Sequence, residues 1–282
     1  MRNQKTIKKT AVFEGIGLHC GIFCHVKLHP APINHGVVIK RIDKDAIIKV
    51  RLDSIFDTQY STTIGNNDVN IQTIEHLLAC LSAFNIDNIL IESDRQEIPI
   101  LDGSCLGLVE IINNAGIIEQ DCPMKFLRIL KPLTHNYNGS SVKIEPSESR
   151  RISYRIDYKG HFIGEQELSI DINQESFIDH IAPARTFGFL KDVDYLKSIG
   201  RALGGSMDNA VVFSDTGVLN DSGLRFPNEC VRHKILDLIG DLSLIAMPIM
   251  GHITADKSGH TLNIQFLKEL LKNSDRFEIV TG

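Results

Sequence analysis

The sequence lacks the excess of basic residues that a nucleic-acid-binding protein normally carries. Its 30 Lys and Arg residues face 35 Asp and Glu residues, which gives a formal net charge of -5 at pH 7. Because affinity for nucleic acid depends on positive charge near the phosphates, we expect no nucleic-acid partner. A diffuse acidic surface of this kind is typical of an ordinary soluble protein.

Long apolar runs are also absent. A membrane-spanning helix needs ~20 apolar residues, whereas the most apolar stretch, residues 236–253, is interrupted by Asp237, Asp241 and His252. Residues 1–15 are basic and polar at their start and contain no apolar stretch of secretory length, so we expect no signal peptide. These absences predict a cytoplasmic protein without a transmembrane segment.

Cysteines are few and scattered along the chain. There are six, and only Cys20 and Cys24 lie close together in the sequence. A structural zinc knuckle normally needs four Cys or His ligands, and no second pair is present. We therefore expect reduced thiols that behave as small buried apolar side chains, and no disulfide framework.

The first half of the chain predicts strands and helices in turn. Apolar and β-branched residues at 24–28 and 37–42 are typical of strands. After Thr73, a candidate N-cap, apolar residues recur at helical spacing. A buried strand is then predicted at 89–92 and a second helix at 108–115.

The second half repeats this order. A polar break with a proline at residues 121–123 is the best boundary, so we divide the chain into domains 1–122 and 123–282. Strand-like segments follow, then a strong helix at 228–245 and a strand near 250–254. The repeat predicts an α+β protein of two similar layered domains, packed face to face with a ligand crevice between them.

The strongest chemical signal lies on the helix at 228–245. His233, Asp237 and Asp241 are spaced i, i+4 and i+8, so an imidazole and two carboxylates share one stripe of this helix. A His and a carboxylate one turn apart can bind one metal ion. The alternative is a solvated polar face on which Lys234 forms local ion pairs with Asp237 and Asp241.

Glu75 and His76 open the first-half helix and offer a third ligand and a base. With His233 and Asp237, His76 would complete two imidazoles and one carboxylate, a catalytic zinc pattern with one position left for water. Ferrous iron could take the same ligands. The sequence has no HExxH motif, so a protease of that type is not indicated. The alternative for Glu75 is a favourable acid in the first helical turn.

Two further segments add candidate groups. The KSGH sequence at 257–260 is a predicted loop that carries His260, and ARTFG at 184–188 presents Thr186 beside an aromatic residue. Taken separately, His260 is more often a surface residue and Thr186 a turn hydroxyl.

Taken together, these residues resemble the UDP-3-O-acyl-N-acetylglucosamine deacetylases of lipid A biosynthesis. The resemblance covers essentially the whole chain, and eight motifs that occur in the same order make a chance match very improbable. The motifs are GIGLH at 15–19, TIEH at 73–76, IPILDGS at 98–104, ARTFG at 184–188, GGSMDN at 204–209, GLRF at 223–226, VRHKILD at 231–237 and SGH at 258–260.

The resemblance implies a zinc amidase that removes the N-acetyl group from UDP-3-O-(3-hydroxyacyl)-N-acetylglucosamine and releases acetate. It implies zinc ligation by His76, His233 and Asp237, and a fold of two β-α-α-β layered domains. We expect a monomer whose partner is this nucleotide-sugar lipid substrate.

The same resemblance implies roles for the remaining site residues. Glu75 is then the general base and His260 the general acid, while Thr186 hydrogen-bonds the oxyanion and Asp241 pairs with His260. Three further residues are implied on the sugar and diphosphate side of the substrate: Phe187, Lys234 and His19.

An insert near 189–213 corresponds to a strand-helix-strand passage for the acyl chain in the family. Its predicted helix at 190–200 has one apolar face, formed by Leu190, Val193, Leu196 and Ile199. Periodicity alone favours packing of this face on the core over lining a passage. Where some relatives carry a cysteine near the metal, this chain has Ser61 and Thr62, so thiolate ligation is not expected.

Two other functions fit the sequence. One is a zinc amidase that acts on a different acylated amino sugar. The other is a catalytically silent module that binds nucleotide sugars or lipids with the same fold.

Overall fold

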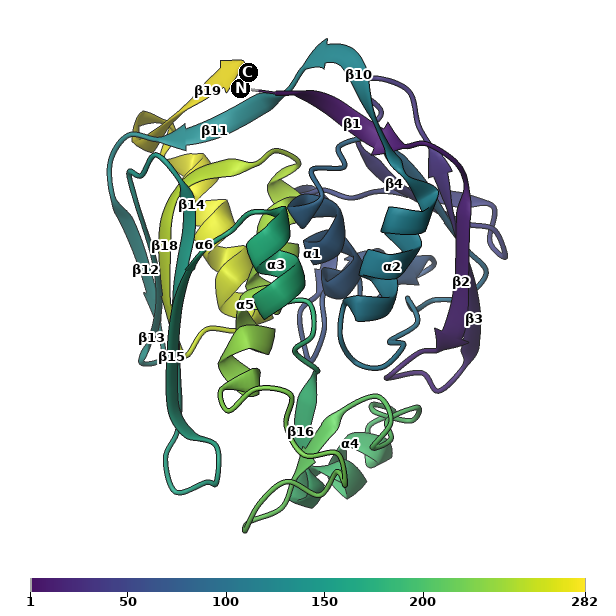
Figure 1. The fold of residues 1–282 in the computed structure, drawn as a ribbon, viewed down its shortest axis with the longest axis vertical. Helices are drawn as coiled ribbons and strands as arrows, with labels where there is room; N and C mark the ends of the chain where they lie inside the picture. The colour runs from purple at the N-terminus through teal and green to yellow at the C-terminus, as the bar shows by residue number, and fades with distance from the viewer. Residues whose placement is uncertain (1, 282) are drawn as a thin grey trace.

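The computed structural model describes residues 2–281 and contains both α-helices and several β-sheets. From left to right, Figure 1 shows the seven-stranded sheet, then helices α6, α5 and α3, then helices α1 and α2, and then the five-stranded sheet. The mixed composition agrees with the predicted α+β class. The division into two face-to-face domains stays a prediction.

The five-stranded sheet is built from the first half of the chain. Its central strand β9 pairs antiparallel with β3 and parallel with β4. Alternate residues of β3 are buried, as expected for a strand with one face on the core. Helices α1 (Glu75–Ala83) and α2 (Leu106–Ala115) belong to this half. The strands, in sheet order, are β2 (Ala11–Ile16), β3 (Phe23–Pro30), β9 (Ile89–Ser93), β4 (Val37–Arg41) and β5 (Ala46–Lys49).

The seven-stranded sheet is built from the second half. Its strand β18 pairs with β11, β13 and β14. The strands are β11 (Lys125–Ile129), β12 (Leu133–Tyr137), β13 (Ser140–Glu145), β14 (Arg150–Tyr158), β15 (Gly164–Asp171), β18 (Ile249–Asp256) and β19 (Phe277–Thr281). The helices of this half are α3 (Gln174–His180), α5 (Glu229–Leu242) and α6 (His260–Lys272).

Smaller elements complete the fold. Strand β10 (Ile117–Pro123) contains the predicted domain boundary, so the chain there is a strand paired with β1 (Asn3–Ile7) and not a loop. A three-stranded sheet comprises β6 (Ile55–Asp57), β7 (Thr63–Gly65) and β8 (Asn70–Ile71). The single-turn 3-10 helices are η1 (Leu52–Ser54), η2 (Leu190–Asp192), η3 (Ser243–Ile245) and η4 (Ser274–Arg276).

The insert forms a strand-helix-strand unit at the lower end of Figure 1. Strands β16 (Phe187–Phe189) and β17 (Val211–Phe213) pair in parallel, and helix α4 (Val193–Ser198) lies between them in sequence. The expectation that its apolar face packs on the core is wrong. Leu190 is 53% and Ile199 44% exposed, because α4 is short and extends away from the helical layers.

Two local predictions also need correction. Thr73 does not cap α1: Ile74 precedes the helix, Thr73 has a φ of 59°, and its hydroxyl donates to Glu97. The segment at 257–260 is not wholly a loop, since His260 is the first residue of α6, a helix the sequence analysis did not predict. The predicted strands at 24–28, 37–42 and 89–92 and the helix at 108–115 are confirmed.

Helices α1 and α5 pack closely at Gly240. A Cβ atom at this position would lie 2.2 Å from the carbonyl oxygen of Glu75, so the absence of a side chain allows the two backbones to approach. This contact places the start of α1 beside α5. It therefore fixes the distance between the two parts of the candidate metal site described below.

We predict that Gly240→Ala destabilises the protein by about 3 kcal/mol, because the added methyl group would clash with main-chain atoms that cannot rotate away. Urea denaturation measures the change in the free energy of unfolding. Gly217→Ala is the matched control, since no atom lies within 4 Å of its Cβ position. Equal stability of the two variants would contradict the close packing of α1 against α5.

Candidate metal centre and active site

Three predicted ligands come together between α1 and α5. His76 lies in the first turn of α1, and His233 and Asp237 lie one turn apart on α5. One ligand atom of each residue lies within 4.8 Å of the other two, and all three residues are buried. The Oδ1 atom of Asp237 is 3.3 Å from Nε2 of His233 and 3.8 Å from Nε2 of His76. Residues far apart in the sequence therefore share one small volume.

Hydrogen bonding leaves His233 in the form that binds a metal. Its Nδ1 lies 3.0 Å from the carbonyl oxygen of Ala184, and a carbonyl can only accept, so Nδ1 donates and in the neutral imidazole Nε2 has the free lone pair. In His76, the buried Nδ1 has no hydrogen-bond partner within residues 2–281. Burial lowers the pKa of His76 to about 3, so this imidazole is neutral at pH 7.

The donor set fits a divalent cation. Metal ligation requires neutral imidazoles and an ionised carboxylate. Burial acts to raise the pKa of Asp237, but the positive charge of Lys234 and the neighbouring His233 hold it well below its usual value. Two nitrogens and one carboxylate oxygen match the protein ligands of a catalytic zinc or ferrous site.

Lys234 and Phe187 lie beside this centre. The Nζ atom of Lys234 is 2.7 Å from Oδ2 of Asp237, so the local ion pair predicted as the alternative forms with Asp237. It uses Oδ2, whereas Oδ1 is the oxygen that lies near the two imidazoles. The same Nζ lies 5.8 Å from the centre of the Phe187 ring. That ring in turn packs edge-on against His233, at 6.4 Å between ring centres. Both residues therefore border the candidate ligands.

Glu75 and His260 approach each other next to the ligands. Oε1 of Glu75 is 3.9 Å from Nε2 of His260, and the backbone N–H of Thr62 donates to Oε2 of Glu75 at 3.1 Å. Burial raises the pKa of Glu75 to about 7, although the charge of His260 opposes this. A carboxylate that exchanges its proton near neutral pH is suited to general base catalysis.

Asp241 holds His260 from the other side. Its Oδ2 is 2.9 Å from Nδ1 of His260 and also accepts from the side-chain amide of Asn263 at 2.8 Å. Burial disfavours the charged imidazole, but the attraction of Asp241 and then of Glu75 raises the pKa of His260 to about 9. His260 is therefore protonated at neutral pH, as a general acid must be.

Sequence reasoning gave no role to two members of this network: Asn263 was not considered, and Thr62 was noted only where some relatives carry a cysteine. The hydroxyl of Thr62 donates to Oδ1 of Asp241 at 2.5 Å and lies 3.2 Å from Nδ1 of His260. Asn263 lies one turn after His260 on α6 and bonds the same carboxylate. No spacing rule could have found Thr62, whereas recognition of α6 would have placed Asn263 on the same side as His260.

Thr186 lies just before β16, two residues after the carbonyl of Ala184 that binds His233. Its backbone N–H donates to Gly103 at 2.7 Å, and its hydroxyl has no hydrogen-bond partner in the described part of the chain. A buried ion pair between Arg185 and Glu229, at 2.8 Å, ties this segment to the start of α5. Thr186 thus directly precedes Phe187, the ring that packs against His233, and its hydroxyl has no partner within residues 2–281.

His19 lies in the loop between β2 and β3. Its backbone N–H donates to Glu97, and its ring Nδ1 is 3.4 Å from the backbone N–H of Ala202, which lies within the insert after α4. Its buried Nε2 lacks a partner among the described residues. The structure therefore places His19 where the first half of the chain meets the insert.

These features together define a class of protein. A buried pair of imidazoles and a carboxylate can hold a divalent cation, and a carboxylate and a protonated imidazole stand next to that position. This combination of a cation site, a base and an acid is typical of metal-dependent hydrolases.

The chain belongs to the LpxC family, described as UDP-3-O-acyl N-acetylglycosamine deacetylase, whose model matches residues 4–272. A UDP-3-O-acyl-N-acetylglucosamine deacetylase of Thermodesulfovibrio yellowstonii is 46% identical over 269 residues, which cover 95% of this chain and 92% of the relative. A protein of the same name from Oleidesulfovibrio alaskensis is 44% identical over 277 residues, covering 98% and 91% of the two chains. One from Pseudomonas entomophila is 40% identical over 287 residues, covering 99% and 94%.

Family membership confirms the resemblance found in the sequence and the predicted class of enzyme, a deacetylase of lipid A biosynthesis. None of the helices within residues 2–281 is both long and apolar enough to span a membrane.

Proposed function

We propose that this chain is a zinc-dependent amide hydrolase that removes the N-acetyl group from UDP-3-O-(3-hydroxyacyl)-N-acetylglucosamine and releases acetate. The observation that carries the proposal is the meeting of His76, His233 and Asp237 within 4.8 Å, beside Glu75 and His260. We further propose that the chain acts as a cytoplasmic monomer of two layered domains, with this site between them.

An amide is a poor electrophile with a poor leaving group, so its hydrolysis needs help at three points. When bound by His76, His233 and Asp237, zinc supplies a Lewis acid that polarises the carbonyl and acidifies water. Glu75 accepts the proton of the attacking water. His260, held protonated by Asp241, donates a proton to the departing nitrogen.

Thr186 and the residues around the site provide binding and stabilisation. The free hydroxyl of Thr186 donates to the oxyanion, an interaction of a kind worth ~3 kcal/mol. The sugar and diphosphate contact Lys234 and Phe187, which border the candidate ligands. They also contact His19, which lies at the junction with the insert. The exposed apolar residues of the insert line the passage for the acyl chain.

Purified protein loaded with zinc should release acetate from the UDP-linked substrate and produce one free amine for each acetate. The control substrate is the same acylated sugar without UDP, and we expect it to react much more slowly. Equal rates on both substrates would indicate a zinc amidase for another amino sugar. A zinc-loaded protein that binds the UDP substrate but releases no acetate would indicate a catalytically silent module.

We predict a bell-shaped dependence of kcat/KM on pH. Activity falls on the acid side as Glu75 becomes protonated, at or below its pKa of about 7, since a bound cation favours the carboxylate. It falls on the alkaline side as His260 loses its proton near pH 9.

Asp241→Asn removes the charge that raises the pKa of His260, so the alkaline limb should move to lower pH by roughly one pH unit or more. The control Asp275→Asn, at an exposed ion pair with Lys131, should leave both limbs in place. An alkaline limb that does not move in Asp241→Asn would show that His260 is not the group that titrates there.

A further inference from the structure

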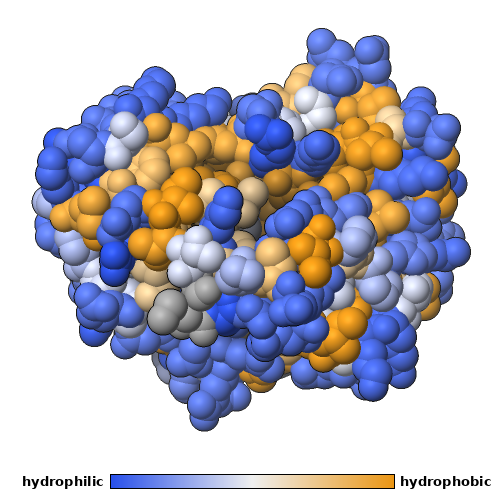
Figure 2. Space-filling model, turned by 90° about the horizontal axis from the view of Figure 1, so that it is seen from above, coloured by the Kyte–Doolittle hydropathy of each residue, from blue (hydrophilic) through white to orange (hydrophobic). Residues whose placement is uncertain are grey.

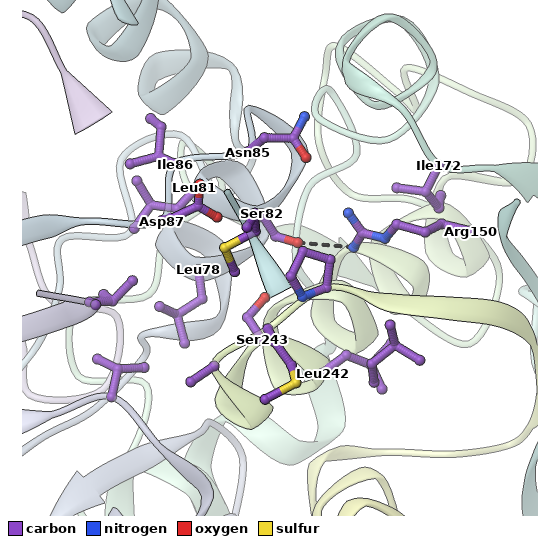
Figure 3. Close-up of a pocket in the computed structure, with 18 of the residues that line it drawn as sticks. Leu78, Leu81, Ser82, Asn85, Ile86, Asp87, Arg150, Ile172, Leu242 and Ser243 are labelled. Atoms are coloured by element: carbon purple, nitrogen blue, oxygen red, sulfur yellow. Dashed lines mark hydrogen bonds between the residues drawn. The ribbon is translucent and has the colours of Figure 1, made fainter. Parts of the chain in front are cut away.

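A cavity lies at the C-terminal ends of α1 and α5, the two helices that carry the candidate metal ligands. Figure 3 shows side chains from the C-terminal end of α1 and from the end of α5 pointing into it, with Arg150 of β14 and Ile172 entering from the other side. The cavity has a volume of about 100 Å³. A water molecule needs roughly 10–15 Å³ of such space, so the cavity has room for several waters or one small organic molecule.

The cavity is separate from the candidate active site. On α1, His76 and Ser82 are six positions apart, which corresponds to ~9 Å along a helix. Asp237 of α5 and Ser243, the first residue of η3, are equally far apart in sequence. Arg2 and Met124, which adjoin β1 and β11 at the top of Figure 1, also line the cavity. Figure 2 looks onto the molecule from that side and shows a hollow near the middle of the face, with hydrophobic residues at its edge.

The charges that line this cavity do not balance. Arg2 and Asp87 form a pair, with both guanidinium nitrogens within 2.7 Å of the two carboxylate oxygens. Arg150 donates only to the hydroxyl of Ser82, at 3.0 Å, and no carboxylate in the described part of the chain lies within 4.0 Å of its guanidinium. The guanidinium of Arg150 is therefore left without a carboxylate partner. Arg151, which also lines the cavity, has its own partner in Asp171 at 4.0 Å.

This charge persists at neutral pH. Burial, with a smaller contribution from the nearby Arg2, lowers the pKa of Arg150 to about 10, so the guanidinium stays protonated. A part-buried charge without a partner is incompletely solvated, so an anion that pairs with Arg150 in this hollow is favoured. Most N–H groups of Arg150 remain free for such an anion, because Ser82 accepts only one of them.

The other lining residues narrow the choice of anion. Apolar side chains form much of the cavity wall, among them Leu78, Leu81, Leu242 and Ile172. A strongly hydrated dianion such as phosphate would lose its water to an apolar wall, which is unfavourable. A monoanion with a short apolar tail satisfies both the guanidinium and the wall, and the carboxylate geometry matches two parallel N–H groups of arginine.

We propose that this cavity binds a short-chain organic carboxylate, with its carboxylate group paired to Arg150 and its hydrocarbon part against the leucines of α1 and α5. This site is independent of the proposed catalytic function. It concerns binding alone, and neither the metal nor turnover is needed to detect it.

Isothermal titration calorimetry of the full-length, zinc-loaded protein with sodium butyrate tests the proposal. Butyramide, a neutral molecule of the same shape, is the control ligand, and sodium chloride keeps the ionic strength constant. We expect Arg150→Met to weaken butyrate binding at least about tenfold, the effect of losing a charge-assisted hydrogen-bond pair. Arg128→Met, which removes an exposed arginine outside the cavity, should bind as the unmodified protein does.

Arg150→Gln provides a second variant that can still bond Ser82, and circular dichroism verifies that both Arg150 variants are folded. A crystal of the unmodified protein soaked in butyrate should show the carboxylate against Arg150. Unchanged affinity in both folded Arg150 variants, equal binding of butyramide, or butyrate at the metal centre alone would each overturn the proposal.

Discussion

His233→Ala is expected to yield a folded protein that holds almost no zinc and releases no measurable acetate. The substitution removes one of three ligands, so His76 and Asp237 alone would have to hold the ion. The lost Lewis acid is worth several kcal/mol in the transition state, which corresponds to a ~10³-fold or greater loss of kcat/KM. Metal analysis after dialysis and an acetate assay measure the two effects on the same sample.

The matched control for this variant is His180→Ala. His180 is exposed at the end of α3, so its loss should change neither the zinc content nor the turnover. Circular dichroism separates loss of metal from loss of fold. If folded His233→Ala retained one zinc per chain and near-normal turnover, the proposed ligand set would be wrong.

Glu75→Ala is expected to keep its zinc, unlike His233→Ala. It is expected to lose turnover, as His233→Ala does. Glu75 is not among the three clustered ligands, so zinc should stay bound. Loss of a general base typically costs ~10²–10⁴-fold in rate, and Glu75 is the buried carboxylate next to His260. Single-turnover acetate release and zinc content, measured together, check both parts.

Two further variants sharpen this test. Glu75→Gln keeps the size of the side chain and should be as inactive as Glu75→Ala, since the amide cannot accept the proton. Glu110→Ala, an exposed glutamate on α2, should behave as the unmodified protein does. Normal turnover in Glu75→Ala would exclude this residue as the base, and loss of zinc would instead assign it to the metal.

The sequence alone predicted most of the elements around the site because hydrophobic periodicity reports local structure. Strand β3 alternates buried and exposed residues, and α5 has one polar stripe. Helix α6 was missed even though Leu262, Phe266, Leu267 and Leu270 are spaced for one buried face. The glycine before His260 indicated a loop, and in the structure the extended Gly259 directly precedes the helix.

The candidate site was only partly accessible from sequence patterns. Helical geometry alone makes His233 and Asp237 neighbours, since they are four residues apart. The approach of His76 depends on the packing of α1 against α5, including the contact at Gly240, and periodicity contains no information on which helices meet. The family resemblance supplied that link.

The positions of Thr62 and the insert show a further limit of prediction from sequence patterns. Thr62 bonds Asp241 across 179 positions of the chain, and no local pattern marks such a pair. The apolar face that includes Leu190 and Ile199 has the period of a packed helix, yet it is exposed. A period identifies an apolar face, and the surrounding fold decides whether that face is covered.

Crystallographic anomalous scattering at the zinc absorption edge tests the central claim most directly. We predict a single strong peak at roughly 2.0–2.2 Å from one atom each of His76, His233 and Asp237, the usual zinc–ligand distances. A zinc-loaded, active crystal with its anomalous peak elsewhere, or with His76 outside the coordination shell, would contradict the account.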